Sequence, residues 1–235
     1  MAGEGELMGI FRNMISEQKP MTLYNTYRGL PFNYVADILA VEQDNVVTRV
    51  DRFQGVSMAQ EGRTYLSSGA FPEVIRASVL EVDFKKEQAT LNEFIRVGGD
   101  VGKRTGIRVQ PNEALEAEIF DGRRRIRGRI VDISSSGMCI FTFGADMYGL
   151  SFRPGWEVYI DFKPPNMETI VRSLGVITNI HYHDGSYLHR LGLKIFPNPE
   201  IRPFLEEYVD RQQKVILKEM EQTYQLKFQE GSSQG

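Results

Sequence analysis

The sequence predicts a mainly β protein made of two small β-barrel domains followed by a C-terminal helix. Three observations lead to this prediction. Short apolar runs and apolar/polar alternations of strand length recur over most of the chain, glycine-containing turns separate them, and a helical period is found only near the two ends. Many short strands with few helices between them are typical of small barrels and sandwiches.

The first predicted domain covers residues 1–97. Residues 6–17 carry apolar side chains at helical spacing and predict a short amphipathic helix that ends before Pro20. A strand is predicted over Tyr34–Val41, followed by a turn and a partner strand at Val46–Val50. Further strands of this domain are predicted at Thr64–Ser67, Val74–Asp83 and Thr90–Val97.

Residues 98–102 form the candidate linker. Three glycines in five residues, with no apolar periodicity and with strands on both sides, indicate a domain boundary. The other interpretation is a hairpin loop inside a single larger domain. We expect two domains, since 235 residues are enough to give each its own core.

The second predicted domain covers residues 103–200 and is a barrel. Asp121-Gly122 and Asp184-Gly185 are short-hairpin signals, because both turn positions tolerate a positive φ. At least six strands in about a hundred residues are enough to close a barrel. The strands are predicted at Ala114–Phe120, Arg125–Ile133, Gly137–Phe143, Gly155–Phe162, Ser173–Tyr182 and Tyr187–Phe196.

Residues 201–235 are predicted to form a charged helix with an apolar stripe and then a flexible tail. Two starts fit this helix. Either Asn198 is the N-cap and Pro199 the first helical residue, or the helix begins later with Pro203 in the first position.

Composition narrows the classes of function. The net charge of −3 gives no support to bulk nucleic-acid binding by the whole chain. The single cysteine, Cys139, cannot form an internal disulfide and suits a reducing compartment, and we interpret it as a small buried apolar residue. No apolar run reaches the ~18–20 residues of a membrane span, and the first residues lack the features of a secretory signal. We therefore expect a cytoplasmic protein without membrane insertion.

Two short motifs lie close together after the linker. Arg104-x-x-x-Arg108 supplies two guanidinium groups, which offer planar stacking surfaces and forked donors for phosphate or for the O6/N7 edge of guanine. Asp132-x-Ser134-x-x-Gly137 follows one hairpin later, directly after an apolar strand. A carboxylate accepts hydrogen bonds from the N1–H and N2–H groups of guanine, and a glycine leaves room at a bend. Together the motifs favour an anionic ligand that contains guanine.

This motif pair on a β framework resembles the PilZ domain, a receptor module for cyclic di-GMP. Gly155–Val158 and Leu191–Phe196 resemble the later strands of that barrel. Leu23–Pro31 resembles part of the N-terminal domain of the YcgR-like flagellar brake proteins. The resemblance covers residues 101–200 and, with the N-terminal match, nearly the whole chain.

The resemblance implies a role for each residue of the motifs. Arg104 and Arg108 would stack on guanine and contact phosphate from the segment that enters the barrel. Asp132 and Ser134 would read a guanine edge from the barrel surface. Gly137 would keep a Cβ atom away from the ligand or the turn.

Two of these assignments have alternatives. Lys103 would add a third positive charge, and in the family its position is linked to whether one ligand or a stacked pair is bound; an ordinary solvated lysine is the other interpretation. For Asp132 and Ser134, the other interpretation is a turn in which both side chains cap their own backbone.

The implied function is that of a cyclic di-GMP effector, with no cofactor and no enzymatic activity. Ligand that draws the two arginines onto the barrel would also pull on residues 98–102 and reorient the N-terminal domain. By analogy with the family, the protein partner would be the flagellar motor, and the protein would be recruited to the flagellar basal body. The sequence leaves open whether the chain forms a homodimer.

A basic run suggests a different function. Arg123–Arg129 could form a nucleic-acid-binding patch on a β protein. The interpretation that we favour is the solvent face of a strand, on which the arginines alternate with Ile126 and Ile130.

Three further functions are considered from the sequence: metal binding, catalysis and self-association. His181, His183 and His189 lie on or beside one predicted hairpin, but no cysteine or acid completes a metal shell around them, so we predict no metal site. The sequence shows no arrangement of serine, histidine and acid that predicts catalysis. A non-catalytic interaction module that associates through the C-terminal helix is the remaining alternative.

Overall fold

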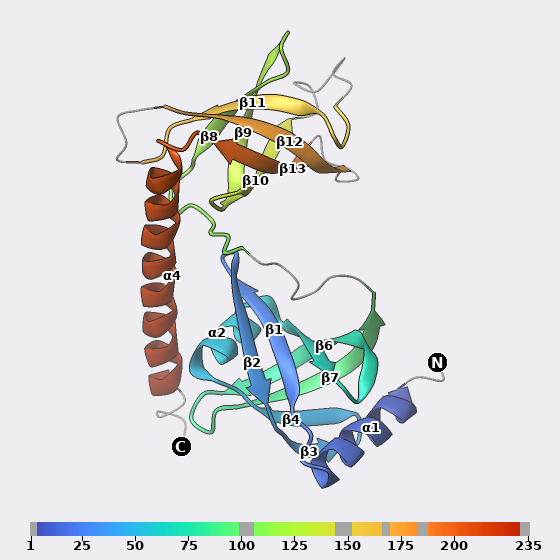
Figure 1. The fold of residues 1–235 in the computed structure, drawn as a ribbon. Helices are drawn as coiled ribbons and strands as arrows, with labels where there is room; N and C mark the ends of the chain where they lie inside the picture. The colour runs from blue at the N-terminus through green and yellow to red at the C-terminus, as the bar shows by residue number, and fades with distance from the viewer. Residues whose placement is uncertain (1–3, 99–105, 144–151, 166–169, 183–187, 231–235) are drawn as a thin grey trace. The chain divides into compact units, whose positions relative to one another are not determined.

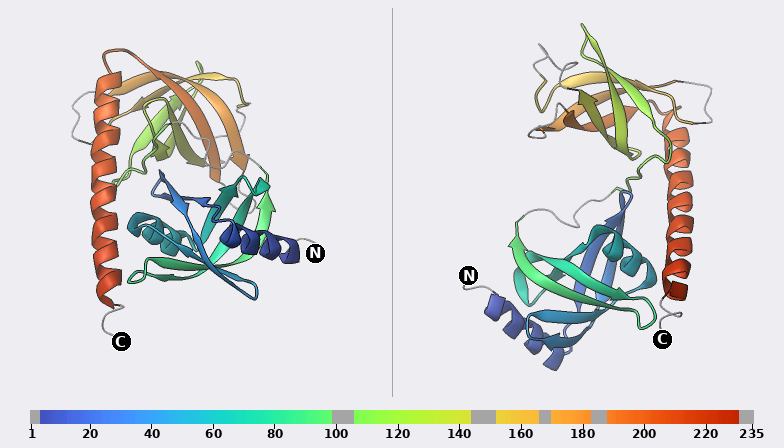
Figure 2. Two further views of the ribbon diagram at one scale, coloured as in Figure 1. Left: turned by 60° about the horizontal axis from the view of Figure 1, so that its bottom comes forward. Right: turned by 180° about the vertical axis from the view of Figure 1, so that it is seen from behind.

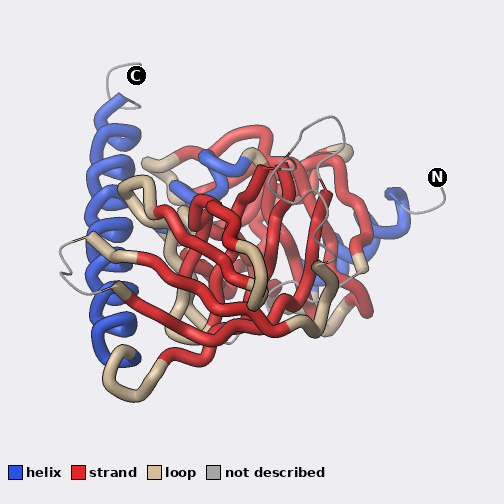
Figure 3. Tube along the Cα trace, turned by 90° about the horizontal axis from the view of Figure 1, so that it is seen from above, coloured by secondary structure: helices blue, strands red, loops and turns tan. Residues whose placement is uncertain are grey.

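The computed structural model describes residues 4–98, 106–143, 152–165, 170–182 and 188–230. The chain divides into two compact units, one formed by Met1–Thr105 together with Ile216–Gly235 and the other by Gly106–Val215. Strands are the commonest secondary structure of both units (Figures 1 and 3), so the prediction of a mainly β protein is confirmed. The linker expected at residues 98–102 lies almost entirely outside the described residues, and the boundary there stays a prediction.

The first unit is built on a seven-stranded antiparallel sheet with the order β2-β1-β5-β6-β7-β4-β3. The sheet curls into a half-barrel (Figure 2). Helix α1 (Glu4–Ser16) confirms the predicted N-terminal helix, and its Phe11 ring lies 5.0 Å from that of Phe94 in the core. The strands are β1 (Met21–Tyr27), β2 (Leu30–Ala36), β3 (Ile38–Glu42), β4 (Asn45–Arg49), β5 (Arg63–Ser68), β6 (Phe71–Asp83) and β7 (Gln88–Val97).

Helix α2 (Arg52–Glu61) lies between β4 and β5 and was not predicted from the sequence. Asp51 caps its start by accepting a hydrogen bond from the backbone N–H of Phe53 at 2.9 Å, and Gly62 ends it with a φ of +64°. The buried residues of the helix include Gln54 and Ser57. Because polar residues share its buried face, the apolar period that normally reveals a helix is missing.

The prediction of one strand over Tyr34–Val41 is wrong, because β2 and β3 separate at Asp37. β2 pairs with β1, whereas β3 pairs with β4. The Asp37 carbonyl oxygen accepts hydrogen bonds from Arg49 N at 3.1 Å and from Thr48 Oγ1 at 2.9 Å. The chain changes its pairing partner there without a break in the apolar pattern, so alternation alone cannot place the boundary.

The second unit contains a closed six-stranded barrel with the order β10-β13-β12-β11-β8-β9, as predicted. Gly122, in the turn between β8 and β9, has a φ of +96°, which fits the predicted Asp-Gly hairpin. The second hairpin signal, Asp184-Gly185, lies outside the described residues. The strands are β8 (Glu116–Phe120), β9 (Arg125–Ile133), β10 (Gly137–Phe143), β11 (Glu157–Phe162), β12 (Val171–Tyr182) and β13 (Leu188–Pro197).

The C-terminal helix α4 (Arg202–Glu230) begins one residue before Pro203, close to the later of the two predicted starts. Asn198 instead closes a turn before the helix, because its carbonyl oxygen accepts from Ile201 N and Arg202 N. The tail after Glu230 lies outside the described residues. None of the helices in the described part of the chain has the length and apolar character that a membrane span requires.

Candidate functional site

An isolated β-bridge holds Arg108 and Asp132 beside each other. Val109 and Ile133, the residues that follow them, exchange two backbone hydrogen bonds of 2.9 Å each. This bridge fastens the segment before β8 to the end of β9. Arg108 Nη1 donates a hydrogen bond to Asp132 Oδ1 over 3.0 Å. The Asp132 side chain is 9% exposed and that of Arg108 is 32% exposed, so a deeply placed carboxylate is covered by an accessible guanidinium.

The turn between β9 and β10 carries the rest of the second motif. Ser134 Oγ donates a hydrogen bond to the Gly137 carbonyl oxygen at 3.0 Å and accepts one from Ser136 N at 3.4 Å. The turn-capping interpretation therefore describes Ser134 in this structure. It does not describe Asp132, whose side-chain contacts are with arginines.

Gly137 leaves no space for a side chain. A Cβ atom there would lie 2.9 Å from the Leu193 carbonyl oxygen and 3.2 Å from Arg108 Nη2. The glycine therefore lets β10 and β13 approach closely and lets the Arg108 guanidinium lie over the turn. Close packing of the backbone explains the glycine in this structure, rather than a positive φ.

A third arginine, which the sequence analysis did not identify, reaches the same carboxylate. Arg190 lies on β13, and its Nη2 atom is 3.6 Å from Asp132 Oδ2. Its Nε–H donates a hydrogen bond to Cys139 Sγ over 2.9 Å. Cys139 pairs with Asp132 between β10 and β9, and Phe141 pairs with Arg190 between β10 and β13. Strand register brings these residues together, and register cannot be read from a single sequence.

The electrostatics of the cluster follow from its burial and charge. Cys139 is buried as predicted, and burial raises the pKa of its thiol above the ordinary 9.0 while the hydrogen bond from Arg190 opposes that shift. The same hydrogen bond raises the pKa of Arg190. Arg108 and Arg190 carry two positive charges against the single negative charge of Asp132. The three side chains together therefore carry a net charge of about +1.

Two residues of the expected site lie outside the described residues. Lys103 and Arg104 fall in the segment 99–105, so the structure gives no geometry for either. Of the six predicted site residues, Arg108, Asp132, Ser134 and Gly137 are brought together at one end of β9 and β10.

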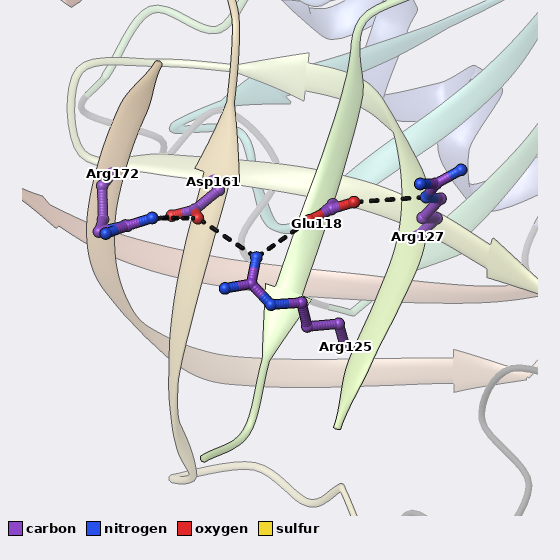
Figure 4. Close-up of polar contacts among 5 residues, drawn as sticks. All are labelled: Glu118, Arg125, Arg127, Asp161 and Arg172. Atoms are coloured by element: carbon purple, nitrogen blue, oxygen red, sulfur yellow. Dashed lines mark hydrogen bonds and ion pairs between the residues drawn. The ribbon is translucent and has the colours of Figure 1, made fainter. Parts of the chain in front are cut away.

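The basic run on β9 forms the solvent face of a strand, as favoured from the sequence. Arg125 and Arg127 are exposed, whereas Ile126 between them is buried. Figure 4 shows that the exposed arginines belong to a row of alternating opposite charges, the charge ladder, whose residues lie on β9, β8, β11 and β12. Arg125 lies 3.1 Å from Glu118 on β8 and 3.7 Å from Asp161 on β11. The ladder continues through Arg127–Glu118 on one side and Arg172–Asp161 on the other.

The histidines do not form a described cluster. His181 pairs with Arg190 and His189 pairs with Tyr182 between β12 and β13, whereas His183 lies outside the described residues. Among the residues that the structure describes, no group of three histidine, cysteine or acidic side chains is placed to hold a metal ion.

No family model and no curated protein matches the chain. Several solved structures are similar to it. One is the inhibitor of motility MotI of Bacillus subtilis, with 15% identity and a TM-score of 0.43 over 83% of this chain and 95% of that one. A second is YcgR from Escherichia coli in complex with c-di-GMP, with 12% identity and a TM-score of 0.45 over 92% of this chain and 93% of that one.

A third similar structure is the MrkH–c-di-GMP complex of K. pneumonia, with 12% identity and a TM-score of 0.45 over 94% of this chain and 98% of that one. In this chain itself, the closed barrel carries Asp132, Ser134 and Gly137 where β9 ends and β10 begins, and Arg108 of the first motif contacts Asp132. The chain resembles the YcgR-like PilZ proteins. The closed barrel lies in the unit formed by Gly106–Val215.

Proposed function

We propose that the chain is a non-catalytic effector that binds cyclic di-GMP through the unit that contains the closed barrel. The observation that carries this proposal is the contact between Arg108 and Asp132 beside the Ser134–Gly137 turn. Arg108 and Asp132 are 24 residues apart in the sequence and belong to different motifs. Their contact brings two motifs that suit an anionic guanine ligand together at one place on the barrel.

Binding proceeds in this proposal by exchange of an ion pair. The Asp132 carboxylate accepts hydrogen bonds from the N1–H and N2–H groups of one guanine, which takes over the place of the Arg108 guanidinium. Arg108 then stacks on a guanine and donates to phosphate or to the O6/N7 edge, and Arg104 does the same from its own position. Each charge-assisted contact contributes about 1.5–3 kcal/mol before ordering costs. The net gain is smaller, because the Arg108–Asp132 contact has to be broken.

The output in this proposal is a change in the position of the first unit. Arg104 follows the glycines of residues 98–102 directly in sequence. A ligand that fixes Arg104 and Arg108 on the barrel restricts this segment and favours one arrangement of the units over others. By analogy with the family, the signal passes to the flagellar motor at the basal body and regulates motility.

The charge ladder argues against the nucleic-acid alternative. Binding to the phosphate backbone of a nucleic acid needs basic side chains whose charge is not already neutralised by acidic neighbours. Arg125 and Arg127 already contact Glu118, and Arg125 also contacts Asp161. Arg125 and Arg127 therefore each have a partner of opposite sign, which weakens the positive field of this face.

The variants that test the proposal are Arg108→Ala and Asp132→Ala in the full chain. The matched control is Arg172→Ala, which removes an arginine that is also ion-paired, on the same barrel but at the ladder. In a titration with cyclic di-GMP, we expect each site variant to lose about tenfold to a hundredfold in affinity and the control to match wild type. Equal affinities for all four proteins would contradict the proposal.

A further inference from the structure

We propose that Arg190 is a third arginine that binds the ligand in this site, and that Cys139 holds its guanidinium in position. This inference rests on the proposed function and extends the site from the two sequence motifs to strand β13. Two contacts of the Arg190 guanidinium support this inference. Its Nε–H donates a hydrogen bond to Cys139 Sγ over 2.9 Å, and its Nη2 lies 3.6 Å from Asp132 Oδ2.

The position of Arg190 is fixed by the barrel. Arg190 stands opposite Phe141 in the β10–β13 ladder and opposite His181 in the β12–β13 ladder, so its backbone is paired on both sides. Its side chain is 41% exposed, which leaves the guanidinium accessible from solvent. A strand-borne arginine of this kind presents its donors with little loss of conformational freedom on binding.

The guanidinium has donors to spare. It carries five N–H groups, and within the described part of the chain it contacts the Cys139 sulfur and the Asp132 carboxylate. The Asp132 contact of 3.6 Å is longer than a good hydrogen bond, so it holds the group by charge more than by geometry. Within the described residues only the long contact with Asp132 engages Nη2, and no contact is seen for Nη1, so the Nη edge can turn to a phosphate or to the O6/N7 edge of guanine.

Asp132 divides its two oxygens between two arginines. Oδ1 accepts from Arg108 and Oδ2 lies nearest to Arg190. When a guanine edge occupies this carboxylate, both guanidinium groups lose part of their counter-charge and can turn to the anionic part of the ligand. The excess of one positive charge among the three residues suits a ligand with two phosphates.

Cys139 acts in this inference as a positioning residue. Its sulfur accepts a hydrogen bond from Nε–H and thereby holds that side of the guanidinium beside β10. Cys139 is 2% exposed, so its own contact with the ligand is excluded. The thiol affects ligand affinity only indirectly, by positioning the Arg190 guanidinium.

The test compares Arg190→Ala, Arg190→Lys, Cys139→Ala and the control Arg172→Ala with wild type by calorimetry with cyclic di-GMP. We expect about a tenfold or greater loss for Arg190→Ala, a smaller loss for Arg190→Lys because a lysine keeps the charge but not the fork, and a loss of a few-fold for Cys139→Ala. Arg190→Ala should also make the affinity less sensitive to salt, whereas Arg190→Lys should keep the wild-type salt dependence. A purely structural role would not separate these two variants by their salt dependence.

The outcomes separate this inference from the function on which it rests. Wild-type affinity and wild-type salt dependence in a folded Arg190→Ala protein, or wild-type affinity in Arg190→Lys, would overturn the role of Arg190 while leaving the site intact. Absence of binding by the wild-type chain would overturn both proposals. If Arg190→Ala fails to fold, Arg190→Lys decides, since it preserves the charge beside Asp132.

Discussion

The Arg108 guanidinium donates a 3.0 Å hydrogen bond to the Asp132 carboxylate. Each of these residues belongs to a separate motif, and each would be unremarkable alone. Their contact means that the arginine has a counter-ion before any anionic ligand arrives. In the proposed function, ligand binding exchanges one set of charged contacts for another, which limits the gain in affinity but keeps the carboxylate from being buried without a partner.

The first prediction concerns Gly137. Replacement by alanine should lower the free energy of unfolding by about 1–3 kcal/mol, because the new Cβ atom would lie 2.9 Å from the Leu193 backbone carbonyl, which cannot move without disturbing β13. Urea denaturation measures this change. Gly106→Ala is the control in the same unit, since a Cβ atom there meets nothing within 4 Å. Equal stability of the two variants would show that β10 and β13 are not packed as closely as described.

The second prediction concerns the Cys139 thiol. The hydrogen bond from Arg190 lowers its pKa and the charge of Asp132 raises it, both against a larger upward effect of burial. Arg190→Ala should therefore raise the pKa of Cys139 further, and Asp132→Ala should lower it. Because the chain has one cysteine, ¹³Cβ labelling of cysteine gives a single NMR signal to follow against pH. Shifts in the same direction for both variants would contradict the described cluster.

The third prediction concerns the acid stability of the barrel. Hydrogen bonds from Arg172 to Asp161 lower the pKa of Asp161 below its ordinary value of 3.8. A lowered pKa in the folded state stabilises the fold above the unfolded pKa, and this contribution is lost as the pH falls through the folded pKa. The free energy of unfolding of Asp161→Asn should thus fall below that of wild type at neutral pH and approach it below about pH 3.8. Arg172→Ala should show the same convergence; a constant gap at all pH values would argue against this ion pair.

The fourth prediction concerns the exposed arginines of β9. The double variant Arg125→Ala/Arg127→Ala should bind cyclic di-GMP as wild type does, because both side chains lie in the charge ladder rather than at Asp132. Wild type should also bind single-stranded and double-stranded oligonucleotides weakly, with a shallow dependence on salt. Fluorescence anisotropy at several salt concentrations measures this. Tight, steeply salt-dependent binding that the double variant loses would favour the nucleic-acid alternative instead.

The parts of the fold that could be predicted from the sequence are those with a strong local signal. β9 and β10 have the predicted bounds, since a hairpin with Gly122 and clear alternation determines them. Helix α2 could not be predicted, because its buried face includes Gln54 and Ser57. The break at Asp37 was missed because the chain changes its pairing partner while the apolar alternation continues.

The residues of the candidate site also differ in whether the sequence could predict them. Arg108, Asp132, Ser134 and Gly137 could be found because they belong to short motifs with fixed spacing. Arg190 could not, because its place beside Asp132 depends on how β13 registers with β10. A lone arginine in a strand is a common surface residue, and only the three-dimensional arrangement distinguishes this one.

Calorimetric titration of the full wild-type chain with cyclic di-GMP, with cyclic di-AMP as the matched control, tests the central claim most directly. We predict saturable binding of cyclic di-GMP with one or two ligands per chain, and at least about tenfold weaker binding of cyclic di-AMP, which lacks the N2–H donor and the O6 acceptor. Absence of binding, or equal binding of the two dinucleotides, would contradict a site in which Asp132 and the arginines recognise guanine.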